Sequence, residues 1–442
     1  MKEKTILKTH KKVNTIETDV AVVGGGLSGI ITALTCASNG LKTLLVEKYG
    51  FVGGLIATSF GYPLRVFTFQ RNFSELLISD EQGEHPEIIQ FPIFSTFIKY
   101  LLKNQAIPEN LLPDPLKISG AIIPFDFEKF KFTLLELLID FNVDCLFHAS
   151  FVRANLQGDK VKSIYVFGKE GLIEIKARYF VDATGNCNLF NSIDESFTVQ
   201  VESYATYNFV LNNCNFEAKD DQIICEVVES ENFERGVYHA YVINIDDLKL
   251  AVYELPLKNH SLVFGGERIQ IEPNDVVSIS KAEENLQLKI YSLLEKLKKF
   301  KPFEKSRISM FPAQVYFTES RRLNSLYTLT SKDVFEDKSF TDEICIVKIS
   351  VIGEKIFPCF VRPEKKFDNM IIRIPFSSFI TKIKNLVVVG RGAGLSEDLK
   401  FVLYSFPFVM KSSENIGKII SFAFKNEIDL TEFKPKVKFE WS

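Results

Sequence analysis

The residues with the clearest chemical meaning are three glycines and one acid near the start of the chain. Gly24, Gly26 and Gly29 follow the apolar run 20–23 in the spacing Gly-x-Gly-x-x-Gly. This spacing is typical of a loop that binds a pyrophosphate: Gly24 permits a tight turn, Gly26 lets the pyrophosphate approach the backbone, and Gly29 lets a helix pack against the strand. Glu47, about twenty residues later, can accept hydrogen bonds from both hydroxyls of a ribose and would repel a 2′-phosphate.

The elements around these residues occur in the order of a βαβ unit. The valine-rich run 20–23 predicts a buried parallel strand, and residues 43–46 predict a second strand that ends at Glu47. Between them, apolar residues at helical spacing predict a helix that begins near Leu27 and Ser28 and ends at Gly40. A glycine-rich turn is the alternative for the glycines alone. The agreement of all the elements predicts dinucleotide binding.

The residues after Glu47 resemble a family of FAD-dependent oxidoreductases, the flavoproteins with two dinucleotide-binding domains and a glutathione-reductase-like FAD fold. In EKYGFVGGLIATS, Lys48 matches the basic position of that family's E-[RK]-x-G-x-x-GG segment, and Gly53 and Gly54 match its glycine pair. In the family this pair passes close to the ribityl and flavin end of FAD, where a planar ring leaves little room for a Cβ. The alternative is an ordinary glycine turn.

Later segments keep the family's order as far as about residue 420. A helix-then-strand pattern leads to Val152, a position that lines the adenine in the family. KARYFVDATGNCNL carries the second FAD signature, Ala183-Thr184-Gly185, and IPFSSFITKIKNLVVVGR resembles the segment that returns to the flavin through Gly390-Arg391. FTESRRLNSLYTLTSKDVF resembles the family's Arg-Arg motif before a Tyr-x-Leu-Thr-x-x-Asp turn.

The resemblance and the patterning together predict an α/β fold. We expect a Rossmann-like FAD-binding domain with a central parallel sheet and a β-meander, plus an inserted α+β cap domain with an antiparallel sheet. A chain of 442 residues exceeds one ordinary core. The expected FAD-binding domain comprises residues 1–60, 120–195 and 375–442, and the expected cap or substrate domain comprises 61–119 and 196–374. An amphipathic helix is predicted over 284–300 and a closing helix over 407–424.

Arginines are the candidate catalytic residues, because in a flavoprotein the cofactor carries the redox step and the protein supplies position and charge. Arg391 could stabilise a reduced flavin or bind pyrophosphate; alternatively it anchors the last helix through a salt bridge. Arg321 and Arg322 would point to opposite faces of an extended segment, so at most one could hold a substrate carboxylate while the other pairs with an acid such as Glu319. Arg65 is a weaker candidate for the same role.

The chain departs from the family near its end. Members usually carry a small-residue helix, roughly G-Q-A-A-G, whose amino terminus faces the flavin pyrimidine. Here the segment reads Ser-Ser-Glu-Asn-Ile-Gly and keeps only Gly417, while the usual S-x-R ahead of it is replaced by residues 402–404. Either the substrate differs from those of the family or catalysis has decayed.

The composition argues against several other classes of protein. A net charge of −3 gives no case for nucleic acid or an anionic membrane, and no apolar run approaches the ~20 residues of a membrane helix. Seven cysteines form no CxxC pair and no metal-ligand spacing, so we expect no metal and a reducing compartment, most simply the cytoplasm. The sequence leaves the oligomeric state open.

These observations predict an FAD-dependent oxidoreductase that binds FAD non-covalently and transfers hydride or electrons between the flavin and a small organic substrate. One alternative is a catalytically decayed FAD-binding subunit with a structural or electron-transfer role. A second is an NAD-dependent dehydrogenase, although a simple NAD fold needs neither the Ala-Thr-Gly segment nor the glycine pair after Glu47.

Overall fold

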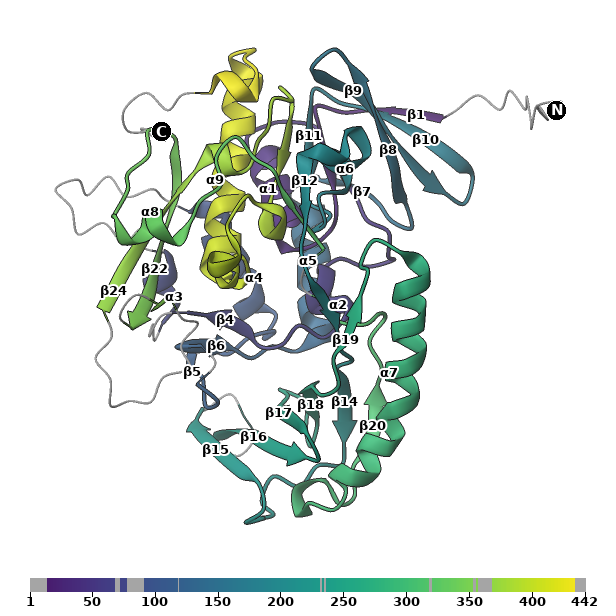
Figure 1. The fold of residues 1–442 in the computed structure, drawn as a ribbon, viewed down its shortest axis with the longest axis vertical. Helices are drawn as coiled ribbons and strands as arrows, with labels where there is room; N and C mark the ends of the chain where they lie inside the picture. The colour runs from purple at the N-terminus through teal and green to yellow at the C-terminus, as the bar shows by residue number, and fades with distance from the viewer. Residues whose placement is uncertain are drawn as a thin grey trace.

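The computed structural model describes residues 14–67, 72–77, 91–117, 119–230, 233, 236–317, 320–352, 355–356 and 368–433. A five-stranded sheet of order β25-β11-β2-β3-β7 lies at the centre of its larger part (Figure 1). All four neighbouring pairs are parallel. The strands are β2 (Val20–Val23), β3 (Thr43–Val46), β7 (Asp144–Leu146), β11 (Tyr179–Asp182) and β25 (Leu386–Val388). Their continuous apolar runs suit strands that are covered on both faces.

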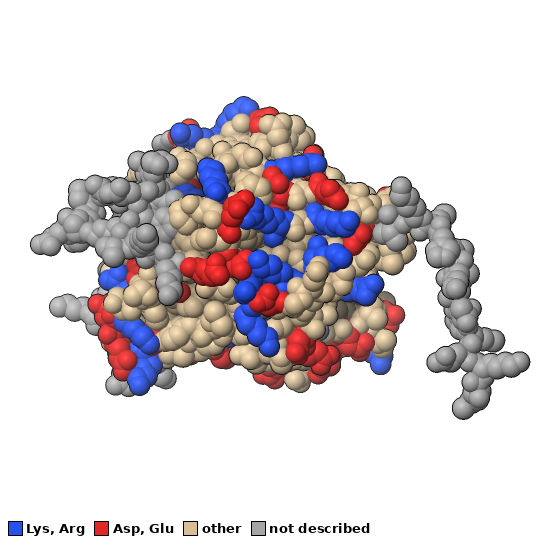
Figure 2. Space-filling model, turned by 90° about the horizontal axis from the view of Figure 1, so that it is seen from above, with Lys and Arg blue, Asp and Glu red and all other residues tan. Residues whose placement is uncertain are grey.

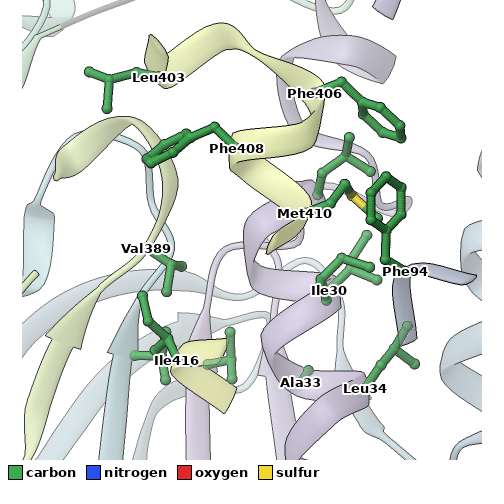
Figure 3. Packing of buried hydrophobic residues seen from close by; sticks show 14 of the residues in the cluster. Ile30, Ala33, Leu34, Phe94, Val389, Leu403, Phe406, Phe408, Met410 and Ile416 are labelled. Atoms are coloured by element: carbon green, nitrogen blue, oxygen red, sulfur yellow. The ribbon is translucent and has the colours of Figure 1, made fainter. Parts of the chain in front are cut away.

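Helices cover this sheet, and two of them come from opposite ends of the chain. The helices are α1 (Leu27–Ser38), α4 (Pro92–Lys103), α5 (Phe127–Asp140) and α9 (Phe406–Lys425), and the two from opposite ends of the chain are α1 and α9. α9 packs directly on α1, where the Thr32 hydroxyl donates to the Ser413 carbonyl at 3.1 Å. Figure 3 shows Phe406 and Met410 of α9 packed toward Ile30 and Phe94. The last helix therefore completes the core that the first helix begins.

A four-stranded sheet of order β1-β10-β9-β8 stands beside the parallel sheet. Its strands are β1 (Asn14–Glu17), β8 (Ser150–Gln157), β9 (Lys160–Gly168) and β10 (Gly171–Lys176). β8, β9 and β10 form the predicted β-meander, because the Gly158 turn and the Gly168–Gly171 turn connect antiparallel neighbours. β1 adds to it in parallel with β10.

The smaller part of the molecule, at the bottom of Figure 1, is an antiparallel sheet with one long helix. The sheet has the order β15-β16-β17-β18-β14-β20, and α7 (Val276–Leu297) covers it. Its strands are β14 (Phe209–Asn212), β15 (Ile224–Glu229), β16 (Val237–Ile245), β17 (Leu248–Glu254), β18 (Ser261–Gly265) and β20 (Arg307–Met310). α7 starts earlier than predicted because Asp275 accepts from the amides of Val277 and Ser278 and so caps the helix.

The remaining elements lie outside these three sheets and their long helices. The helices are α2 (Gly54–Thr58), α3 (Phe73–Leu77), α6 (Asn188–Ile193) and α8 (Ser331–Phe335). The strands are β4 (Leu64–Val66), β5 (Leu112–Pro113), β6 (Ala121–Ile123), β12 (Thr198–Gln200), β13 (Ser203–Ala205), β19 (Ile269–Ile271), β21 (Arg321–Leu323), β22 (Glu343–Ile352), β23 (Lys355–Ile356) and β24 (Asp368–Pro375). None of the helices within the described residues has the length and apolar character that crossing a bilayer requires.

Two hydrophobic cores underlie this architecture, and they divide the chain differently from the sequence-based boundaries. The smaller core draws only on residues 205–317. The larger core contains α4 and its neighbours, which we expected in the cap domain. The reason is that α4 buries Phe94 and Phe97 against α9 and α5, and an amphipathic pattern does not reveal which partner it faces. The predicted α/β class, parallel sheet, meander and antiparallel second sheet are confirmed.

Candidate functional site

A cavity of about 390 Å³ lies at the carboxyl edge of the parallel sheet. The segments that follow all five strands line it: 24–28 after β2, 47–49 after β3, 149–151 after β7, 183–186 and 188 after β11 and 389–391 after β25. Parallel α/β sheets bind ligands in this position, outside the carboxyl ends of their strands. The cavity continues to residues of the smaller part, including Phe264 and Tyr316. It is therefore shared between the two parts of the molecule.

Two glycines of the first glycine loop have no room for a side chain. A Cβ on Gly24, whose φ is +116°, would lie 2.2 Å from the Ala183 carbonyl oxygen, and a Cβ on Gly29 would lie 2.0 Å from the Gly24 carbonyl oxygen. Gly29 itself does not line the cavity, in keeping with a packing role between helix and strand. Gly26 does line it, with Leu27 and Ser28 beside it at the start of α1.

A second glycine pair packs against the first loop. The amide of Gly53 donates to the Gly25 carbonyl at 2.7 Å, and a Cβ on Gly54 would lie 2.9 Å from the Gly26 Cα. Gly53 and Gly54 both have positive φ, at +121° and +55°. The two loops thus meet backbone to backbone, and both face the cavity.

Glu47 is held in a fixed position at the end of β3. It is buried, and its two carboxylate oxygens accept from the Gly25 amide at 2.7 Å and from the Tyr49 amide at 2.9 Å. Each oxygen of a carboxylate has two lone pairs, so each keeps one for a ligand. The arrangement suits recognition of a ribose.

Positive potential faces the cavity from two long helices. α1 begins at N-cap Gly26 and α9 at N-cap Ser405, and in neither does a side chain cap the helix or an acid occupy the first turn. Leu27 and Ser28 of α1 and Phe406 and Val409 of α9 line the cavity. Exposed amides and the helix dipole favour an anion at such ends.

Two cationic side chains add to this potential. Lys48 lines the cavity with its ammonium 4.9 Å from the centre of the Tyr49 ring. Burial lowers the pKa of Lys48, Glu47 raises it in part, and Arg391, which lines the same cavity, lowers it further. A bound anion would relieve their repulsion.

Arg391 lies against the second FAD signature. A Cβ on Gly185 would meet its Nη2 at 2.5 Å, and its Nη1 donates to the Phe317 carbonyl at 3.4 Å. Gly390, at φ +72°, could not carry a Cβ either, because the Ser28 hydroxyl would lie 2.5 Å away. Gly185, Gly390 and Arg391 therefore form one tight wall of the cavity.

A buried acid that sequence reasoning missed fixes this wall. Asp182, the last residue of β11, accepts from the Thr184 hydroxyl at 2.6 Å and from the Leu189 amide at 2.8 Å. It thereby joins the Ala183-Thr184-Gly185 turn to the start of α6. Its position directly before the Ala-Thr-Gly signature was the available signal.

The structure does not bring the arginine pair of β21 to the cavity. Arg322 is buried, and it donates to Glu397 at 2.7 Å and to the Leu395 carbonyl at 3.1 Å. Arg321 donates to Asn188 at 3.3 Å. The two side chains do take separate partners, but neither residue lines the cavity, and the expected partner Glu319 lies outside the described residues.

Two predicted cofactor contacts also lie elsewhere. Val152 is 46% exposed on β8, and the preceding residues Ala149, Ser150 and Phe151 line the cavity instead. Val152 thus lies outside the cavity lining, and its contact with the adenine stays a prediction.

Gly417, like Val152, is a predicted cofactor contact that does not line the cavity. It lies inside α9 rather than at its start, and a Cβ there would come within 2.6 Å of the Thr35 Cβ of α1. It permits the close packing of the two helices. The end of α9 that faces the cavity is Phe406–Val409, so the segment Ser412–Gly417 does not contact a cofactor in the way that we expected.

The acid that departs from the family pattern has a structural role. Glu414 is fully buried and accepts from the amides of Ile93 and Phe94 at 3.3 and 2.8 Å, which caps the start of α4. Lys418, one turn on, pairs with it at 3.3 Å. The divergence at this position therefore reflects how α9 holds α4.

The chain belongs to the family of FAD dependent oxidoreductases. The model of that family matches residues 19–432, which is nearly the whole chain. FAD is accordingly the cofactor of its family, and the cavity fits it: uncapped helix starts, two cations, a ribose-type acid and close-packed glycine loops line one space. Within the described residues, no cluster of His, Cys, Asp or Glu could hold a metal ion.

Individual relatives match only short stretches. A 4-oxocyclohex-2-ene-1-carboxylate 5-dehydrogenase of Sinomonas cyclohexanicum is 44% identical over 54 residues, which is 12% of this chain and 9% of the relative. A thiamine thiazole synthase of Methanococcus vannielii is 40% identical over 63 residues, which is 14% of this chain and 24% of the relative. The matches thus span less than a quarter of either relative.

Solved structures match most of the chain at low sequence identity. One is p-nitrophenol 4-monooxygenase from Pseudomonas putida, with 12% identity, a TM-score of 0.49 and coverage of 94% of this chain and 81% of that one. Another is a geranylgeranyl bacteriochlorophyll reductase-like protein from Thermoplasma acidophilum, with 12% identity, a TM-score of 0.46 and coverage of 94% and 80%.

Proposed function

We propose that this protein is an oxidoreductase enzyme that holds FAD non-covalently and oxidises or reduces a small organic substrate at the far end of the same cavity. The observation that carries the proposal is the continuity of that cavity. Its lining runs from Glu47 past Gly26 and Arg391 to Tyr62, Phe264 and Tyr316. A cofactor and a substrate could therefore meet in one cavity, which is what a flavin reaction requires.

The residues of this chain have distinct proposed roles toward FAD. Glu47 would bind the ribose of the adenosine, and the amides at the start of α1 would bind the pyrophosphate. The positions that would contact FAD are those predicted from the sequence that line the cavity, namely Gly24, Gly26, Leu27, Ser28, Glu47, Lys48, Gly53, Gly54, Ala183, Thr184, Gly185, Gly390 and Arg391. FAD supplies the redox chemistry when bound.

Arg391 is the proposed catalytic residue, since it lies in the cavity wall between the FAD signature and the smaller part. Its charge would stabilise negative charge that develops near it. We propose no catalytic role for Arg321 or Arg322, because their contacts are structural. We also keep the proposed division into an FAD-binding domain and a cap domain, with 205–317 as the core of the cap.

A non-catalytic FAD-binding subunit remains the second candidate. The observation that favours it is that α9 presents Phe406 and Val409 to the cavity, so an apolar surface replaces the small residues of related chains. The two candidates differ in turnover and share the cofactor.

An anaerobic reduction experiment separates them. The FAD-loaded protein is mixed with a panel of alcohols, amines and organic acids, and the flavin absorbance near ~450 nm is followed. We expect at least one compound to bleach it, and we expect Arg391→Met to slow bleaching about tenfold or more. Arg322→Met is the matched control and should bleach at the normal rate. Photoreduction without reduction by any compound would support the subunit instead.

A further inference from the structure

Arg65 and Tyr316 line the cap end of the cavity. Neither residue has a role in the FAD binding or catalysis proposed above. Arg65 comes from β4 and Tyr316 from the segment after β20, so the two residues derive from segments far apart in the chain. Both line the cavity. Only the folded structure therefore places both residues in the lining of one cavity.

Arg65 is fixed in place by an ion pair with the buried carboxylate of Asp114 and by a hydrogen bond to Tyr253. Its Nη1 donates to Asp114 at 3.1 Å and its Nη2 to the Tyr253 hydroxyl at 3.2 Å. A guanidinium carries five N–H donors, so these two contacts leave donors over. The same Asp114 oxygen also accepts from the amide and the hydroxyl of Ser119, and the other oxygen accepts from the Leu116 amide. Asp114 thus divides its acceptor capacity among several donors.

Tyr316 is held by its backbone and directs its ring to the cavity. It exchanges two hydrogen bonds with Thr206, at 2.8 and 2.9 Å, and its ring meets the Phe264 ring edge-on at 5.5 Å between centres. Burial raises the pKa of Tyr316, while Arg391 and Arg65 lower it in part. The hydroxyl therefore stays protonated at neutral pH, which makes it a hydrogen-bond donor.

The surrounding wall is apolar and aromatic. Tyr62, Pro63 and Leu64 line it from one side, and Phe264, Phe317 and Leu403 line it as well. A ligand that satisfies this end must pair an anionic, planar acceptor with an apolar body. A carboxylate can accept two parallel N–H bonds from a guanidinium and a further bond from a phenol.

We propose that Arg65 and Tyr316 bind the carboxylate of the substrate, so that the substrate is an organic acid with an apolar or aromatic body. The proposal rests on the function proposed above and names its substrate class. It assigns the anion to the cap end, whereas Lys48 and Arg391 serve the cofactor end.

Isothermal titration calorimetry tests this directly, with or without bound FAD. The probes are benzoate and phenylacetate, and the neutral controls are benzyl alcohol and phenethyl alcohol. We expect each acid to bind at least about tenfold more tightly than its alcohol. Tyr316→Phe should weaken the acids several-fold and Arg65→Met at least about tenfold, with little change for the alcohols. Arg65→Lys should fall between wild type and Arg65→Met, because it keeps the charge and loses the planar fork.

Arg268→Met is the matched control, since Arg268 is exposed in the smaller part and does not line the cavity. Each variant's melting temperature and FAD content are recorded alongside. Acids that bind no better than alcohols, or equal affinities in Tyr316→Phe, Arg65→Lys and wild type, would overturn the proposal. If FAD content stays normal in that case, the proposed flavin function survives and only the substrate class falls.

Discussion

We propose that recognition of the nucleotide depends more on the carboxylate of Glu47 than on any other side chain. It accepts from two backbone amides and retains one lone pair on each oxygen for a ribose. Glu47→Gln replaces one oxygen by a donor and removes the charge. We expect the dissociation constant for FAD to rise about tenfold, equivalent to about 1.4 kcal/mol. Fluorescence titration of the apoprotein with FAD measures it.

Glu17→Gln is the control for that prediction. Glu17 is also a glutamate, but it is exposed on β1 of the four-stranded sheet. Its variant should bind FAD like the wild type. A twofold or smaller change for Glu47→Gln would mean that Glu47 serves only to shape the loop.

The motif around Arg322 suggested that it could bind a substrate carboxylate. Its contacts indicate instead that it stabilises the fold. It joins β21 to the loop of Glu397 through a charged pair and to the Leu395 carbonyl. Arg322→Met should therefore lower the free energy of unfolding by about 1.5–3 kcal/mol in urea titrations. The FAD dissociation constant should not change. Loss of FAD affinity without loss of stability would return Arg322 to the site.

The turn between β2 and α1 depends on the space around a glycine as well as on its φ. Gly24 and Gly40, at φ +116° and +85°, flank α1, but a Cβ meets Ala183 at 2.2 Å from Gly24 and finds nothing within 4 Å from Gly40. Gly40→Ala should cost only the backbone strain, about 1–2 kcal/mol. Gly24→Ala adds a clash with backbone, so we expect a loss above about 3 kcal/mol or insoluble protein.

Thermal and urea unfolding of the two variants measure this difference. The order is the informative result, since both substitutions are chemically identical. Equal losses would show that the contact of Gly24 with the Ala-Thr-Gly turn is easily relaxed.

The junction of α9 and α4 should respond to pH through Glu414. Burial raises the pKa of Glu414 above its ordinary 4.5, with Lys418 and the amides of Phe94 and Ile93 opposing the rise. An acid with a raised pKa binds its proton more tightly in the folded state, so it contributes stability at low pH that is lost as pH rises from about 4.5 through the folded-state pKa. Wild type should lose more stability than Glu414→Gln over that interval.

Urea midpoints at pH 4.5 and pH 7 in both proteins provide the comparison. Their difference cancels the other titrating groups that the two proteins share. A larger loss in Glu414→Gln than in wild type would mean that the ion pair with Lys418 outweighs the cost of burying the charge.

Over the entire chain, local sequence patterns predicted helices and strands well where a pattern is compatible with only one kind of secondary structure. The strand, glycine loop, helix and acid of residues 20–47 occur where expected, because glycine spacing and apolar runs leave little choice. The family resemblance extended this to the segments at Ala183 and Gly390, which line the same cavity.

What the sequence could not predict are pairings between distant segments. Glu414 looked like a departure from a cofactor motif because nothing local shows that it caps α4. Gly417 fitted a motif but faces Thr35. Arg65 and Tyr316 are far apart in the chain, and only tertiary packing places both in one cavity. Contacts of this kind follow from the whole fold.

The charged side chains on one face of the molecule can be compared with those of the cavity for a pattern that could indicate a function. On the face shown in Figure 2, basic and acidic side chains are interspersed, and no large area has a single sign. The net charge of −3 agrees with this mixture. The chemistry that distinguishes this chain lies inside, between the two hydrophobic cores.

The visible absorption spectrum of the purified protein, recorded before and after heat denaturation, tests the account most directly. We predict bands near ~370 and ~450 nm that pass into the supernatant on heating, with about one FAD per chain. That result would establish non-covalent FAD in the cavity and justify the substrate experiments. A protein that is colourless as purified, and that binds no FAD when it is added, would contradict the account, because the cavity would then not be an FAD site.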